Sequence, residues 1–430
     1  MTSKIVGNHK SEIALSFIII ISGLLNLNKA IDIVIDFLWI ALFIYCLVRG
    51  SNLIYGVIGG SSLFMSQLLL PFTSILLVNV FYVITCVYFI CAKQRQNRLL
   101  VNSKMFALYL IIATYSIFVL NSYLSKTTQL ILVLSSMLLC CELVIRLRNS
   151  DNLFVFSKGF VLATISACFY GLIRNNSFID AADRFVGTST DPNYFGFYII
   201  ISLVLFGVFK SKIKPIPYKL IVGLHIILAI LTGSNTALIA ITMIFILHVL
   251  QSEISPVYKV LYIGSVVSFG IIILFNRLGL GQMLLGVNTN NYYINRFSKT
   301  FGYILIGESN LATSGRTDIL HNYYDTFNGF GLFEKLFGGH VCGAFGVSGD
   351  FGDSGINILP HSFNVDVIYS IGIVGFIFVY YLIINSFKYW FRIRMSDIGR
   401  RMILLKCIVL LYTFSLSFFL GFPSMLFVFI

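Results

Sequence analysis

The chain has 430 residues, of which 58% are hydrophobic and 11% charged, and its formal net charge at pH 7 is +13. This composition excludes an ordinary soluble domain, in which apolar and charged residues are closer to balance. It predicts an all-α polytopic membrane protein, with residues 1–430 forming a single transmembrane domain. We expect no cleavable signal peptide, because the first apolar run lacks a small-residue cleavage pattern and a second run follows at once.

Taken in chain order, the apolar stretches predict about 12 to 14 transmembrane helices, since each crossing needs about 17 to 25 residues. The candidate spans are 12–27, 30–48, 53–70, 73–91, 104–121, 127–145, 154–173, 193–209, 218–232, 234–250, 257–275, 363–386 and 402–420. The tail 421–430 is a candidate to turn back into the bilayer after Pro423.

Basic residues set the expected orientation, because short cytoplasmic loops carry the excess of Lys and Arg. Alternating the spans from a cytoplasmic N-terminus places 21 of the 30 Lys and Arg residues on one side. The main clusters are 93–104, 146–158, 210–219 and 388–406. The positive charge is therefore a topology signal. A nucleic-acid partner is not expected, since it would require basic residues interleaved with aromatic ones on one exposed surface.

Two segments on the opposite side do not follow this pattern, a short outer loop at 174–192 and a long outer loop at 276–362. A loop this long is usually functional or disordered, and its richness in Gly, Tyr and Phe favours a folded cap. Within it we expect an amphipathic helix beginning near Ser314, a good N-cap, with Arg316 in its first turn. Ile319, Tyr323 and Phe327 would form its apolar stripe.

The cysteines and histidines indicate neither a disulfide framework nor a metal centre. Seven of the eight cysteines fall in predicted spans, and Cys342 beside His340 supplies only part of a ligand set. We therefore expect no metal and no other cofactor. His225 and His248 lie in predicted spans, where hydrogen-bonded buried histidines are the expected explanation.

The segment LPHSFNVDVIYSIGIVG, residues 359–375, places His361 at the start of the twelfth span, directly after Pro360. A helix N-terminus presents free N–H groups and disfavours positive charge nearby, and a neutral imidazole near pH 7 is a competent general base. Gly372 and Gly375, three residues apart, would let another helix approach closely. The plainer alternative is a polar interfacial residue with packing glycines behind it. Asp366 would orient a ring, contact an acceptor or complement the helix dipole.

Four segments, in order, resemble motifs of the superfamily that contains O-antigen ligases and Wzy-type polymerases. His361 and Ser362, followed by nine residues and then Gly372 and Gly375, resemble its signature of His, then Asn, Ser or Gln, then nine residues and Gly-x-x-Gly. The other similar segments are RFVGTSTDPNYFG at 184–196, LTGSNTALIA at 231–240, and TSGRTDIL at 313–320 with LFGGHVCGAFG at 336–346 after it. The similarity runs from Arg184 to Gly375.

This resemblance implies a GT-C-like fold and metal-independent glycosyl transfer on the outer face of the bacterial inner (cytoplasmic) membrane. The donor would be a glycan on undecaprenyl diphosphate, and the acceptor another lipid-linked repeat unit in an O-antigen or capsule polymerase. A ligase would instead transfer polymer to the lipid A core. A flippase or other transporter of lipid-linked oligosaccharides is a second alternative, although the chain shows no obvious internal repeat. Membrane lipids are expected contacts, and a chain-length regulator protein is a candidate partner.

The resemblance also assigns roles to residues. His361 would be the general base for the acceptor hydroxyl, and Arg316 first, then Arg184, would bind the diphosphate, for which a guanidinium fork is well suited. Arg316 has an ordinary alternative as a solvated surface residue or an ion-pair partner of a nearby Asp. Asn235 stands where the family usually carries Arg. An Asn donates hydrogen bonds to phosphate without neutralising it, so Arg184 is expected to replace that charge.

Overall fold

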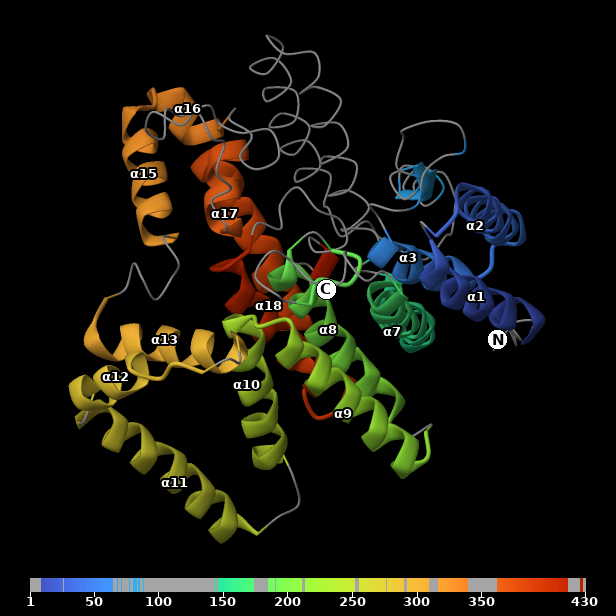
Figure 1. Ribbon diagram of the computed structural model, residues 1–430. Coiled ribbons are helices and arrows are strands. Elements are labelled where there is room, and N and C mark those ends of the chain that lie inside the picture. The colour runs from blue at the N-terminus through green and yellow to red at the C-terminus, as the bar shows by residue number, and fades with distance from the viewer. Residues whose placement is uncertain are drawn as a thin grey trace.

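The computed structural model describes residues 9–25, 27–64, 146–173, 185–189, 191–210, 213–251, 255–275, 277–289, 292–308, 316–338 and 362–416, with residues 426 and 427 and a few isolated positions between 68 and 143. This part of the chain is helical and contains no β-strand (Figure 1). The all-α class predicted from composition is confirmed for these residues.

Most of the helices are apolar and follow one another with short connections. Their bounds are α1 His9–Ile21, η1 Ser22–Leu24, α2 Lys29–Arg49, α3 Leu53–Ser61, η2 Ser62–Phe64, α7 Ser150–Ile173, α8 Pro192–Phe206, η3 Gly207–Phe209, α9 Pro215–Leu231, α10 Asn235–Gln251, α11 Pro256–Phe275, α12 Arg277–Leu285, α13 Tyr292–Ile306, α15 Arg316–Gly329, α16 Leu332–Phe337, α17 Phe363–Arg392 and α18 Asp397–Thr413.

Four helices in the described part are long and apolar enough to cross a membrane, and four shorter apolar helices accompany them. The four are Lys29–Arg49, Ser150–Gly171, Pro192–Phe209 and Ile371–Arg392. The first three agree closely with the predicted spans 30–48, 154–173 and 193–209. An α-helical membrane protein is thus supported. The full count of thirteen spans stays a prediction, because 104–121, 127–145 and most of 73–91 lie outside the described residues.

Local signals in the sequence fix where the spanning helices begin and end. The side chain of Asn28 accepts a hydrogen bond from the N–H of Ala30 at 2.9 Å and caps the start of α2. Gly50 ends α2 with a positive φ of 59°, a conformation that glycine adopts without steric cost. Asp191 caps α8 through the N–H of Asn193, and Pro192 occupies the first helical position.

Glycines let α3 and α7 cross in direct backbone contact. A β-carbon at Gly159 of α7 would lie closer than 3.0 Å to the backbone of Gly56 in α3, and one at Gly59 would lie equally close to the backbone of Phe156. Without a strong hydrophobic force between helices in lipid, such close backbone approach supplies the van der Waals contact that holds them together. The crossing therefore depends on having no side chain at these positions.

An aromatic core joins α7, α8 and α18 with the end of the chain. The ring of Phe160 lies 5.0 Å from that of Phe427, and the ring of Phe197 lies 5.0 Å from that of Tyr412, both in edge-to-face geometry. Phe427 is fully buried. The expectation that the tail turns back into the bilayer after Pro423 stays a prediction, because Pro423 lies outside the described residues.

Basic residues from separate parts of the sequence meet at one end of the bundle. The guanidinium of Arg148 lies 4.0 Å from the centre of the Tyr389 ring, and burial lowers the pKa of Arg148 while Tyr389 opposes that shift. The guanidinium of Arg401 lies directly against Gly207, just before the third basic cluster. The structure thus brings the basic cluster 388–406 against Arg148 of the cluster 146–158 and against Gly207, three residues before the cluster 210–219.

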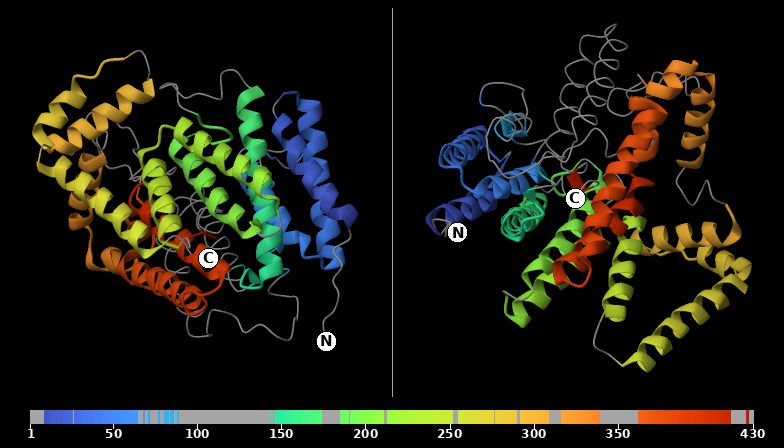
Figure 2. Two further views of the ribbon diagram at one scale, coloured as in Figure 1. Left: turned by 90° about the horizontal axis from the view of Figure 1, so that it is seen from below. Right: turned by 180° about the vertical axis from the view of Figure 1, so that it is seen from behind.

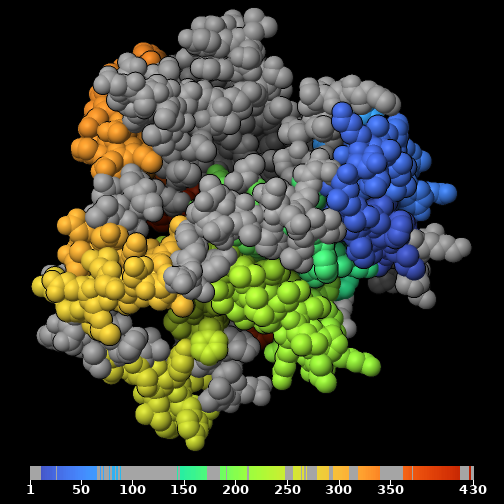
Figure 3. Space-filling view, in the orientation of Figure 1, coloured from blue at the N-terminus to red at the C-terminus, as the bar shows by residue number. Residues whose placement is uncertain are grey.

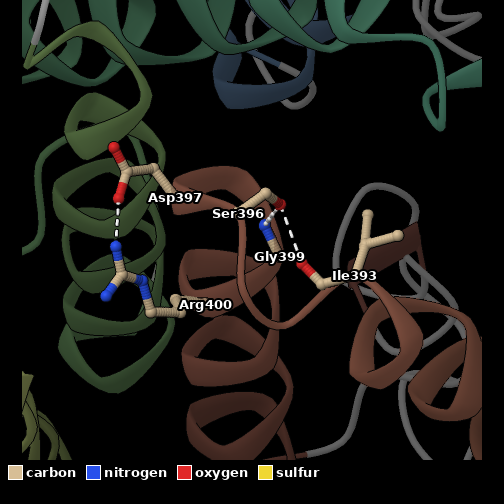
Figure 4. Close-up of polar contacts among 5 residues, drawn as sticks. All are labelled: Ile393, Ser396, Asp397, Gly399 and Arg400. Carbon is tan, nitrogen blue, oxygen red and sulfur yellow. Dashed lines mark hydrogen bonds and ion pairs between the residues drawn. The ribbon is translucent and has the colours of Figure 1, made fainter.

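At the same end a tight turn joins α17 to α18. Figure 4 shows the side chain of Ser396, which accepts from the N–H of Gly399 at 3.0 Å and donates to the carbonyl of Ile393 at 2.8 Å. Arg400 pairs with Asp397 on the first turn of α18. Helix α18 ends at Thr413. The predicted span 402–420 was therefore wrong in its bounds, since the helix starts five residues earlier and stops where Phe414 to Leu416 form a turn.

Helix α17 is broken, and the predicted continuous span 363–386 was wrong. Gly372 has φ 68° and ψ −174°, which is not helical, and it divides α17 into a first arm, 363–371, and a second arm, 373–392. The hydroxyl of Tyr380 donates to Oδ1 of Asn364 at 2.6 Å. In a straight helix these residues, 16 apart, would be separated by about 24 Å along the axis. The two arms therefore fold back on each other at Gly372.

Candidate functional site

Helix α15 packs on the first arm of α17 through aromatic side chains. The buried Tyr323 ring lies 5.1 Å from that of Tyr369, whose hydroxyl donates to the carbonyl of Tyr323. Phe327 and Phe330 also contact Tyr369, at ring-centre distances of 6.1 and 5.2 Å, and Ile319 joins the cluster. The predicted amphipathic helix and its apolar stripe are confirmed, and Arg316 begins this helix. The predicted cap Ser314 lies outside the described residues.

The two helices run in the same direction, so both begin at the same end. Tyr323 of α15 contacts Tyr369 in the first arm of α17. Leu336 of α16, the short helix that directly follows α15, contacts Gly372 at the end of that arm, so the C-terminal ends of α15 and of the arm both lie toward α16 (Figure 1). Arg316 precedes Tyr323 by seven residues and Phe363 precedes Tyr369 by six, which corresponds to about 10 and 9 Å of helix. The backbone of Arg316 and the start of the helix that follows His361 are therefore at matching levels.

The short helix α16 rests on the corner of α17. A β-carbon at Gly372 would lie closer than 3.0 Å to the carbonyl group of Leu336 and to the backbone nitrogen of Phe337. A β-carbon at Gly375 would instead meet the side chain of Ile371, at the end of the first arm. The expectation that small residues allow close approach is thus met at Gly372, where α16 sits. Gly375, in the second arm, leaves room for the side chain of Ile371. Figure 1 shows α15 alongside α17, with α16 across their ends.

The beginning of the first arm is buried inside the protein. Ser362 and Phe363 are buried, and Asp366, one turn further on, is 0% exposed. The N–H of Asp366 donates to the carbonyl of Ser362 at 3.1 Å, which closes the first turn. An acidic side chain in this turn is favourable because the N-terminal end of a helix carries partial positive charge.

A second part of the candidate site lies where α8, α9 and α10 meet. The N–H of Phe185 donates to the carbonyl of Leu231 at 3.1 Å, and the Phe185 and Phe195 rings are 5.0 Å apart. At Gly196, a β-carbon would be 3.0 Å from Oγ1 of Thr232 and 3.3 Å from the β-carbon of Ser234. Described residues of the segments 184–196 and 231–240 are therefore packed together, although 36 to 46 residues separate the contacting positions.

Asn235 links the start of α10 to the outer helix α13. Its Nδ2 group donates to Oγ1 of Thr300 at 3.4 Å. Arg296 precedes Thr300 by one helical turn and so lies on the same side of α13, where it is half-buried. The sequence did not rank Arg296 above the other outer arginines. The hydrogen bond between Asn235 and Thr300 places Arg296 one helical turn from the contact point of Asn235, which stands where the resembled family carries Arg.

The predicted site residues are thus described unequally. Asn235 is described in full, and Arg316 by its place at the start of α15. His361 and Arg184 lie outside the described residues, although Ser362 and Phe185, their neighbours in sequence, are included. The structure pairs α15, which begins at Arg316, with the first arm of α17, which begins at Phe363, and it joins Phe185 to Leu231, four residues before Asn235.

The buried histidine His225 has an ordinary structural role. His225 is fully buried, with Nε2 bonded to Oγ of Ser202 and Nδ1 to the carbonyl of Ile221, each at 2.8 Å. The expectation of a hydrogen-bonded buried histidine is confirmed there, whereas the side chain of His248 is outside the described part. Among the described residues, no three His, Cys, Asp or Glu side chains are placed to hold a metal ion.

Comparison with known proteins identifies no relative: no protein-family model, no curated protein and no solved structure matches the chain. Functional inference therefore depends on the placement of residues and on the motif segments.

Proposed function

We propose that the protein is a glycosyltransferase that polymerises oligosaccharide repeat units carried on undecaprenyl diphosphate, at the outer face of a bacterial inner membrane. The observation that carries the proposal is the common starting level of α15 and the first arm of α17. Helix α15 begins with Arg316, and the first arm of α17 begins two residues after His361. A cation and a base supplied from one level suit a reaction in which an anion leaves while a hydroxyl attacks.

His361 is the proposed general base. The acceptor sugar hydroxyl attacks the anomeric carbon of the donor, a new C–O bond forms, and the bond from that carbon to the diphosphate oxygen breaks. The hydroxyl proton passes to the imidazole, and undecaprenyl diphosphate leaves with the bonding electron pair. A positioned base contributes roughly 10² to 10⁴ in rate. Packing of α15 and α16 against the first arm would hold the base rigidly.

Arginines would bind the departing diphosphate. Arg316 opens α15, where the free N–H groups of the helix start add to the attraction for anions. Arg184 remains a candidate, and Arg296 joins it because α13 is bound to Asn235 through Thr300. Asn235 would add hydrogen bonds without charge. A guanidinium on α13 thus offers the compensation that the substitution of Asn for Arg at position 235 requires.

The test compares two histidine variants in cells that lack this gene. Complementation with His361→Ala should leave single capped repeat units on surface-polysaccharide gels, whereas wild type restores long polymer. The matched control is His321→Ala, because His321 is exposed on α15 and pairs only loosely with Asp325 at 3.6 Å. Long polymer from the His361 variant would refute the assignment of the base. Polymer stranded on the lipid carrier in the deletion would identify a ligase, and an unchanged profile would favour transport.

A further inference from the structure

Helix α13 has one apolar face whose side chains are about half exposed. Ile294, Phe297, Phe301 and Ile304 are 49%, 45%, 38% and 55% exposed. Their spacing of three, four and three residues puts all four on one stripe of the helix. Four large apolar side chains in a row on a helix of 15 residues are more than scattered surface exposure.

Two other faces of α13 contact protein. Gly302 faces α12, where a β-carbon would lie 3.0 Å from the carbonyl of Gly281, so these two helices form a tight hairpin. Thr300 faces α10 and accepts the hydrogen bond from Asn235. Ser298 is buried. After α13 has made its contacts with α12 and α10, the apolar stripe and the side that carries Lys299 remain exposed.

The charge and position of α13 indicate what covers this stripe. The helix contains Arg296 and Lys299 and no acidic residue, and Lys299 is exposed. A basic helix with a concentrated apolar face is typical of helices that lie in a membrane interface. Figures 1 and 2 show α13 running crosswise to α10, at the end of the hairpin that continues from the apolar helix α11. In Figure 3 this region stands at the edge of the molecule.

We propose that α13 lies in the plane of the bilayer surface at the level where α10 begins, with its apolar stripe among the acyl chains and Lys299 toward the phosphate groups. The occupant of the stripe is the lipid of the same membrane that the apolar helices cross. Leu278 and Met283 of α12 are also highly exposed, and they extend the apolar surface of the hairpin. This proposal does not depend on the glycosyl-transfer activity.

Spin labels on the intact protein in vesicles of phosphatidylethanolamine and phosphatidylglycerol test this placement. In a background with the eight cysteines replaced, nitroxides are attached to Ile294→Cys, Phe297→Cys and Phe301→Cys, and separately to Lys299→Cys. For each nitroxide, the rate of collision with apolar oxygen is then compared with the rate of collision with a water-soluble nickel complex. Ile44→Cys on the spanning helix α2 provides the lipid reference, and His321→Cys on α15 the water reference, because both side chains are exposed.

The three stripe labels should favour oxygen over nickel several-fold, as Ile44→Cys does, whereas the labels at 299 and 321 should favour nickel. Nickel collisions at the stripe equal to those at 321 would overturn the proposal, because the stripe would then face water. Weak collisions with both reagents would show a protein cover, and dipolar broadening between labels would show a second copy. Either of these results also overturns it. Three separate stripe positions ensure that one misfolded variant does not decide the outcome.

Discussion

Replacing Gly372 by alanine adds one methyl group at the corner of α17, where two independent penalties arise. The backbone there has φ 68° and ψ −174°, a region that costs a residue with a side chain about 1–3 kcal/mol. The new β-carbon would also lie closer than 3.0 Å to the backbone of Leu336, which cannot rotate away as a side chain can. Overpacking of this kind costs about 1–3 kcal/mol.

Together these penalties predict a loss of about 2–6 kcal/mol in the free energy of unfolding for Gly372→Ala. The assay is reversible unfolding by dodecyl sulfate in mixed micelles, followed by circular dichroism. Gly223→Ala on α9 is the matched control, because no atom lies within 4 Å of its added β-carbon and its φ is not positive. It should retain wild-type stability, since alanine is the better helix former.

Unfolding of Gly372→Ala at the wild-type dodecyl sulfate concentration would contradict the bend at Gly372. That result would mean that α17 runs straight through position 372 and that α16 does not rest on it. A variant that cannot be purified gives no free energy, so a second measurement is a distance between spin labels at positions 364 and 380. Folded-back arms keep these positions close, whereas a straight helix separates them by about 24 Å.

Two further outcomes are expected. Arg296→Lys should lose most polymerase activity, because a lysine lacks the planar fork for phosphate, while the control Lys299→Arg retains it. The activity is measured as polymer formed from lipid-linked repeat units in vesicles. Full activity of Arg296→Lys would exclude the guanidinium fork as a requirement. Gly159→Ala should destabilise the protein by about 1–3 kcal/mol in the same unfolding assay, since its β-carbon would strike the backbone of Gly56. Gly264→Ala, with open space around it, should be neutral, and equal stability of the two variants would contradict the close crossing of α3 and α7.

The two glycines of the Gly-x-x-Gly segment have separate tasks that sequence spacing does not reveal. Position 372 needs both a positive φ and contact with α16, whereas position 375 leaves room for the side chain of Ile371. A simple helix-packing motif would use both glycines against one partner helix. Here Gly372 contacts α16, whereas Gly375 contacts Ile371 of the first arm, so the two glycines lie on opposite sides of one bend in α17.

Hydropathy and helical periodicity were sufficient to predict the membrane class, the helices α2, α7 and α8, and the stripe of α15. These features are local, because a run of apolar residues or a repeat of three to four positions specifies a helix and its buried face without reference to the rest of the chain. The buried state of His225 followed in the same way from its place in an apolar run.

Only the tertiary structure determined the corner at Gly372, the pairing of Phe185 with Leu231, and the approach of α13 to Asn235. Residues 363–386 were predicted as one span because hydropathy does not show where a helix changes direction. Glycine is also common in the apolar helices of membrane proteins. At Gly372 the helix bends where the backbone of α16 packs directly against it, and this contact is not visible in the sequence. Arg296 gained its place near α10 through Thr300, a contact between residues 65 apart that no local pattern encodes.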